Sequence, residues 1–130
     1  MQDTYLIECD DDTLKEHHAL YKWSAYLEKA SDLSGRTLRA TQKYKDWMIE
    51  AGFEEVTVVK RKWPLNPWPN DRKLKELGAW NQVNMQDGVQ GITLALFTRV
   101  LGMPQAEVEV FLADVRKDMR DRSVHSYLPM

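Results

Sequence analysis

One segment of the sequence can be crossed neither by a helix nor by a central strand. Residues 63–70 read Trp-Pro-Leu-Asn-Pro-Trp-Pro-Asn, and each of the three prolines lacks the backbone N–H that helices and strand ladders use. The segment predicts an irregular loop over 64–70. A chain of 130 residues has room for one hydrophobic core, so we expect a single domain over 1–130.

The chain before this loop alternates between β-favouring and helical patterns. A short β-favouring stretch predicts a strand over 1–9. Apolar residues then recur at helical spacing over 13–52, where Thr13–Glu16 match a capping box and Gly52 supplies a stop. Clustered valines predict a second strand over 53–63.

The chain after the loop is dominated by helical periodicity. Helices are predicted over 71–122, with a break or a kink around Gly88 and Gly91 and a last helix that starts at Pro104. A final short strand is predicted over 123–130. This alternation indicates a helix-rich α/β fold with about three strands and four to five helices.

Charge and cysteine content exclude several classes of function. The formal net charge of −2 gives no electrostatic reason to bind nucleic acid or an anionic membrane. Cys9 is the only cysteine, so a disulfide within the chain and a cysteine-built zinc site are excluded, and no metal site is expected. The chain has neither a leader-like N-terminus nor an apolar run of membrane-spanning length. We therefore expect a cytoplasmic or nuclear protein.

Several motifs resemble the LaeA-like fungal methyltransferases in order and spacing. They are Ala51–Val56, the proline–tryptophan segment 63–69, Leu74–Asn81, Leu94–Gly102 and His125–Tyr127. The resemblance covers nearly the whole chain and maps it to the C-terminal half of the family. It implies part of a class I methyltransferase, a Rossmann-like fold whose family cofactor is S-adenosylmethionine.

The resemblance does not extend to a cofactor site. In the family, a glycine-rich turn after the first strand approaches the cofactor, and an acidic residue further on binds its ribose. The six glycines of this chain are dispersed, and none follows an apolar strand in a G-x-G-x-x-G arrangement. We expect the cofactor-binding N-terminal half to be absent, and therefore no cofactor-binding residues and no cofactor for this chain alone.

The absence of that half has a consequence for partners. The stretch 1–9 would have a bare strand edge, and it carries no proline or lysine to prevent pairing with another chain. We expect a homo-oligomer such as a dimer, or a protein partner, through this strand.

Residues around the loop and near the C-terminus are the candidates for a site. Large aromatic side chains line small-molecule pockets as readily as they fill cores. The predicted substrate-binding residues are Trp63, Trp68, Trp80, Asn81, Asn84 and Tyr127. His125 is the candidate catalytic residue, as a general base near neutral pH. The alternatives are structural packing or surface exposure for His125 and, for the aromatic set, a rigid loop that holds the last helices on the sheet.

Three functions stay open at this point, and the sequence does not decide whether the chain is an enzyme. The resemblance favours a methyltransferase-like protein of fungal secondary metabolism that cannot bind S-adenosylmethionine or transfer methyl groups alone. The second is a cyclase or isomerase that acts on a small molecule in an aromatic pocket without this cofactor. The third is a non-catalytic interaction module.

Overall fold

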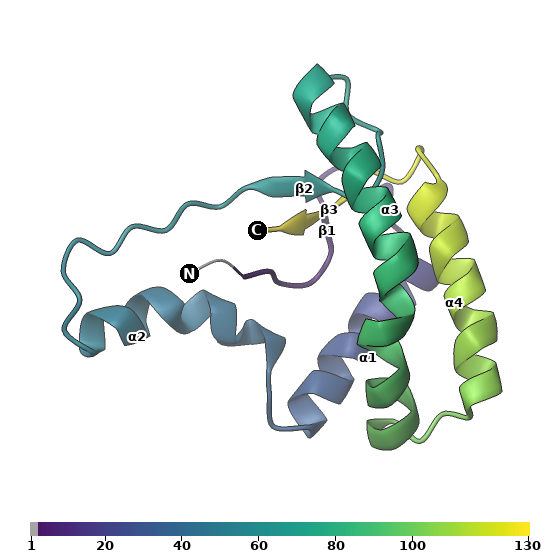
Figure 1. Ribbon diagram of the computed structural model, residues 1–130, viewed down its shortest axis with the longest axis horizontal. Helices are drawn as coiled ribbons and strands as arrows, with labels where there is room; N and C mark the ends of the chain where they lie inside the picture. The colour runs from purple at the N-terminus through teal and green to yellow at the C-terminus, as the bar shows by residue number, and fades with distance from the viewer. Residues whose placement is uncertain (1–2) are drawn as a thin grey trace.

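A computed structural model describes residues 3–130, and it confirms the α/β fold class (Figure 1). The strands are β1 (Glu8–Cys9), β2 (Lys62–Pro64) and β3 (Ser126–Pro129). The helices are α1 (Ala19–Leu33), the 3₁₀ segment η1 (Leu38–Lys43), α2 (Tyr44–Glu50), α3 (Arg72–Ala95), the π-helical segment η2 (Leu96–Val100) and α4 (Gln105–Arg120). In the part of the chain that is described, no helix is long and apolar enough to cross a membrane.

The sheet places β3 between the other two strands, in the order β1-β3-β2. Both outer strands run antiparallel to β3, with Glu8 opposite Tyr127 and Trp63 opposite Leu128. β1 and β2 are therefore parallel to each other, and the chain crosses from one to the other through α1, η1 and α2. One end of the sheet therefore contains the carboxyl ends of β1 and β2 together with the first residues of β3, and we call it the carboxyl end of the sheet.

The hydrophobic core lies among α1, α3, η2 and α4. α2 and the segment 51–61 that follows it stand apart from these helices, and we call them the arm (Figure 1). The buried indole of Trp23 donates a hydrogen bond to Thr93 Oγ1 at 2.8 Å, and Thr93 donates to the Val89 carbonyl at 2.6 Å. The buried apolar residues of these helices include Leu20, Leu27, Met85, Phe97, Val108, Leu112, Val115 and Met119. The periodic positions of α4 face this core, as its sequence pattern predicts.

The helix start predicted at Thr13 is wrong, because α1 begins at Ala19. The hydroxyl of Thr13 donates to Asp11 Oδ1 at 2.8 Å and accepts from the backbone N–H of His125 at 2.8 Å. It is therefore committed to a tertiary contact and does not cap a helix. His18, the residue that precedes α1, makes no side-chain capping bond.

The strands predicted over 1–9 and 53–63 are much longer than the strands observed. Residues 1–2 lie outside the described residues, and from 3–7 only Tyr5 donates a backbone bond to β3, at 3.3 Å to the Pro129 carbonyl. Val58 and Val59 are 52% and 65% exposed. The valine-rich segment has no neighbouring strand, so its β-branched residues do not form a ladder.

Of the break or kink predicted around Gly88 and Gly91, the break is wrong. α3 continues through both glycines to Ala95, because its buried residues hold it against the core. The irregular turn comes later, at η2, where Thr98 Oγ1 donates to the Leu94 carbonyl at 2.7 Å. Pro104 precedes α4 as its N-cap instead of being its first helical residue.

The proline–tryptophan loop is fastened between α3 and α4 through Asn66. The Asn66 side-chain amide is fully buried and donates to the carbonyls of Met119 at 3.1 Å and Asp121 at 3.0 Å. It thus satisfies carbonyl groups that the end of α4 leaves without helical partners. α3 passes so close that a methyl group at Gly78 would lie 2.3 Å from the Asn66 carbonyl oxygen.

We predict that Gly78→Ala lowers the free energy of unfolding by about 2 kcal/mol or more, because the methyl group forces α3 away from the loop. Gly88→Ala is the matched control, since nothing lies within 4 Å of a methyl group there. It should raise stability by about 0.5–1 kcal/mol, since alanine loses less backbone entropy in a helix. Urea unfolding of both variants measures the difference, and equal effects would contradict the close approach.

Candidate functional site

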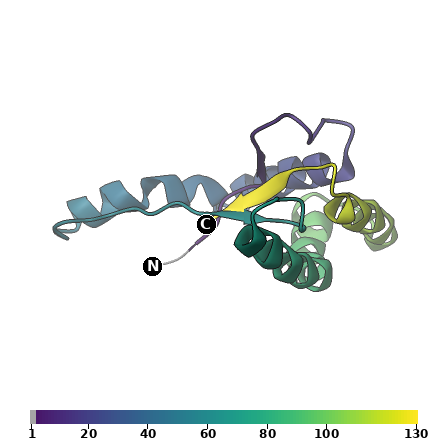
Figure 2. The same cartoon turned by 90° about the horizontal axis from the view of Figure 1, so that it is seen from above.

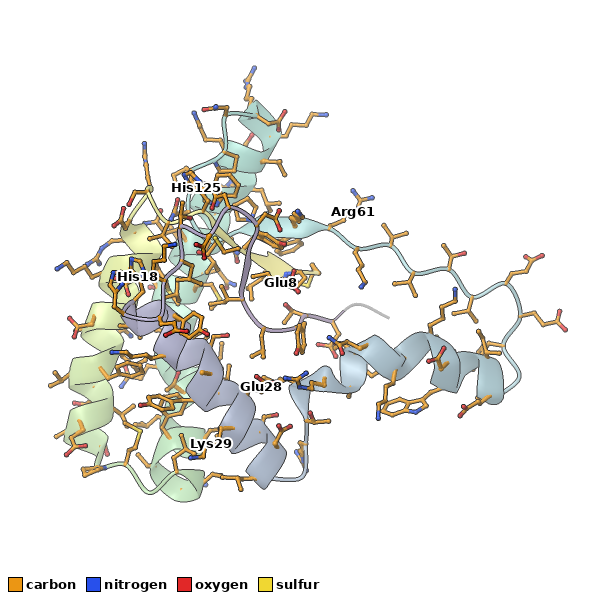
Figure 3. All side chains as sticks on the ribbon, turned by 180° about the vertical axis from the view of Figure 1, so that it is seen from behind. Glu8, His18, Glu28, Lys29, Arg61 and His125 are labelled. Carbon is orange, nitrogen blue, oxygen red and sulfur yellow. The ribbon has the colours of Figure 1, made fainter. Side chains whose placement is uncertain are left out.

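The candidate site lies where the carboxyl ends of β1 and β2 meet the start of β3. Ligands of open α/β sheets bind outside the carboxyl ends of the strands. Asp11 follows β1, Trp68 follows β2, and His125 directly precedes the antiparallel β3, so the topology brings the three residues together. In Figure 3, His125 lies at the end of the sheet that is next to the helices, and Arg61 lies on the arm.

His125 and Asp11 form a pair through His125 Nδ1 and Asp11 Oδ2. The bond from His125, followed by the bond from the Thr13 hydroxyl, holds the pKa of Asp11 well below its usual range. An ionised carboxylate only accepts hydrogen bonds, so neutral His125 carries its proton on Nδ1 and leaves Nε2 free. Since the His125 side chain is 34% exposed, this arrangement suits a general base that a carboxylate orients.

Trp68 covers one face of the His125 ring. The two rings stack with centroids 4.7 Å apart and an interplanar angle of 25°. Trp68 is itself fixed, because its Nε1 donates to the Ser126 carbonyl at 3.0 Å and its backbone N–H donates to the Asn66 carbonyl at 2.9 Å. The imidazole is thus held by Asp11 at Nδ1 and by an indole along its face.

A second polar group surrounds Tyr127, on the central strand. Its hydroxyl oxygen lies 2.7 Å from Asp10 Oδ1 and 3.0 Å from Glu8 Oε2. Burial first, and these carboxylates next, raise the pKa of Tyr127 above its ordinary value. Lys62 pairs with Asp10 and lies 4.8 Å from the Tyr127 ring centroid; its bond is the main cause of the lowered pKa of Asp10. Tyr127 therefore stays neutral and serves as a hydrogen-bond donor.

No family model matches the chain, and no solved structure matches it significantly. It is 37% identical to the probable methyltransferase tdiE of Emericella nidulans and 35% identical to the methyltransferase pytC of Aspergillus terreus. It is 32% identical to the secondary metabolism regulator laeA of Monascus pilosus. The chain is therefore homologous to part of these fungal proteins. These matches cover 95%, 90% and 92% of the chain, but the chain spans only 39%, 36% and 32% of the relatives.

Within residues 3–130, no glycine-rich turn follows a strand. The glycines with positive φ are Gly35, Gly52 and Gly102, and each follows a helical segment. Within residues 3–130, β1 is followed instead by the acidic run Asp10–Asp12, whose three carboxylates all have partners. Residues 3–130 contain no group of three or more histidine, cysteine, aspartate or glutamate side chains that could hold a metal ion.

The predicted site residues do not gather in one pocket wall. Trp68, His125 and Tyr127 lie at the carboxyl end of the sheet, whereas Trp63 is half-buried and packs against the core. Asn81 is buried, where its amide donates to the Pro64 carbonyl at 2.9 Å.

Trp80 and Asn84 point elsewhere, because both are exposed on α3 and Trp80 is 72% exposed. α3 therefore meets the loop through Gly78 and Asn81 instead of forming one wall with it. The residues that sequence reasoning missed are Asp11 and Thr13. The signal that could have found them is their place directly after β1, where the sequence predicts only a helix cap at Thr13.

We predict that His125→Ala raises the pKa of Asp11 toward its ordinary 3.8. Since the pKa of Asp11 is lower in the folded state than in the unfolded state, its ionised form stabilises the fold above about pH 4 and this is lost on acidification. Wild type should therefore lose stability more steeply in acid than the variant. Carbon-13 NMR titration of the Asp11 carboxyl measures the shift.

The control for this titration is Ser123→Ala. The pKa of Asp121 is lowered mainly by Ser123, so that variant should move Asp121 and leave Asp11 unchanged. An Asp11 titration that is unaffected by His125→Ala would contradict the pair.

Proposed function

We propose that this chain supplies the acceptor side of a LaeA-like methyltransferase of fungal secondary metabolism, with His125 as the proton acceptor. The observation that carries the proposal is the His125–Asp11 pair at the carboxyl end of the sheet, where the His125 ring stacks against Trp68. The match of 90–95% of the chain to the proteins named as methyltransferases supports the class of reaction.

The chemistry assigned to this chain is proton transfer. When bound, S-adenosylmethionine would supply an electrophilic methyl group and leave as S-adenosylhomocysteine. An acceptor oxygen or nitrogen that carries a proton must lose that proton in the transfer. Nε2 of His125 takes this proton, and the ionised Asp11 stabilises the imidazolium that results. A positioned base of this kind typically contributes about 10²–10⁴-fold to a rate.

We further propose that the chain does not bind S-adenosylmethionine by itself. Support comes from its glycines, none of which forms a turn after a described strand, and from the carboxylates that occupy the turn after β1. Methyl transfer then requires residues that the relatives have outside the matched region.

A second candidate is a cyclase or isomerase that does not use S-adenosylmethionine. It is favoured by one observation, which is that the pair of His125 and Asp11 is complete within this chain and needs no cofactor to move a proton. Conversion of a substrate by the chain alone, without S-adenosylmethionine, would distinguish it from the first proposal.

A third candidate is a non-catalytic role with a protein partner at the free edge of β1. The name of the Monascus pilosus relative, a secondary metabolism regulator, agrees with this candidate. The partner at β1 stays a prediction.

We predict that calorimetric titration of the purified chain with S-adenosylmethionine and with S-adenosylhomocysteine gives no binding heat. The full-length tdiE protein of Emericella nidulans is the positive control for both ligands. Micromolar binding by the isolated chain would contradict the proposal that it lacks a cofactor site.

The role of His125 can be tested in a chimera in which this chain replaces the matching region of tdiE. We predict that His125→Gln lowers methyl transfer about 10²–10⁴-fold and leaves binding of S-adenosylmethionine unchanged. His17→Gln is the matched control, because His17 is an exposed histidine outside the site. Equal activity of the two variants would show that His125 is not the base.

A further inference from the structure

The segment Val56–Arg61, which is the part of the arm that leads into β2, is a strand-like edge without a neighbour among the described residues. Val58 and Val59 point to opposite faces of an extended chain, yet they are 52% and 65% exposed, so neither face is covered. Within residues 3–130, residues 54–60 form no backbone–backbone hydrogen bond. Figure 2 shows this segment and α2 projecting together from the rest of the molecule.

The direction of the free backbone groups follows from Arg61. Arg61 exchanges two backbone hydrogen bonds with Met130, each 2.8 Å long, so its N–H and C=O groups face the end of β3. Because these groups alternate in direction along a strand, those of Val58 and Lys60 face away from β3. An unpaired row of this kind is a template for another strand.

The charges along the segment are complementary to themselves in the antiparallel direction. The segment is preceded by Glu54–Glu55 and ends with Lys60–Lys62. If Val58 lies opposite its own counterpart, Glu55 lies opposite Arg61 of the second copy, and this contact occurs twice. In this register Val58 and Lys60 both offer outward backbone groups, as an antiparallel ladder requires.

The two charged side chains are available for this contact. Glu55 and Arg61 are exposed, and neither belongs to any ion pair that the described residues form. Glu55 has a φ of 54°, so it lies at the turn that starts the segment and at the rim of the contact.

We propose that two copies of this chain pair antiparallel along residues 56–60, about a two-fold axis at Val58. The partner is a second copy because the same short segment supplies both the hydrophobic centre and the opposite charges of an isologous interface. This interface is on the β2 side of the sheet, opposite the β1 edge, and it does not depend on the proposed function.

Sedimentation velocity over a micromolar concentration series tests the proposal with charge reversals. Wild type should dimerise, whereas Glu55→Lys and Arg61→Glu should each raise the dissociation constant on the order of tenfold or more, because each sets like charges opposite each other twice. The double variant E55K/R61E restores opposite charges and should dimerise like wild type, as should an equimolar mixture of the single variants.

The control is Glu50→Lys, which reverses an exposed glutamate of α2 outside the segment and should leave association unchanged. Val58→Lys places two lysines together at the axis and gives an independent loss of dimer, with circular dichroism to verify the fold. A wild type that stays monomeric overturns the proposal. So does a dimer that the reversals at residues 55 and 61 leave intact, which would point to another edge such as β1.

Discussion

The rest of the structure depends on the hydrogen bonds that the buried side chain of Asn66 donates to the end of α4. The side-chain amide of Asn66 joins the proline-rich loop to the last carbonyls of α4, and the backbone carbonyl of Asn66 accepts the backbone N–H of Trp68. α3 packs against the same residue at Gly78, where a hydrogen is the only side chain that fits. One asparagine therefore sets the positions of two helices, of the loop and of the indole that stacks on His125.

The site depends on this placement because an imidazole is useful as a base only when its proton is on the correct nitrogen. Asp11 selects that nitrogen, and the lowered pKa of Asp11 keeps the carboxylate an acceptor near neutral pH. Trp68 restricts the orientation of the ring through its own bond to Ser126. Local structure, packing and electrostatics thus fix a partly exposed imidazole at the end of the sheet outside which ligands of open α/β sheets bind.

Parts of this arrangement could be predicted because they depend on local chemistry. The prolines determine the loop, and the spacing of Val108, Leu112 and Val115 determines α4. Strand lengths could not be predicted, since a valine-rich segment forms a ladder only beside another strand. Trp68, His125 and Tyr127 could be selected from the sequence, but Asp11 could not, because its contact joins residues 114 positions apart.

The central claim is that Asp11 orients His125 as a base. Nitrogen-15 NMR of the imidazole nitrogens, at a pH at which the ring is neutral, tests this claim most directly. His125 should be held as the tautomer protonated on Nδ1, with Nε2 unprotonated, and Asp11→Asn should remove this preference. A ring protonated on Nε2 in the wild-type chain, or the averaged shifts of a free histidine, would contradict the account.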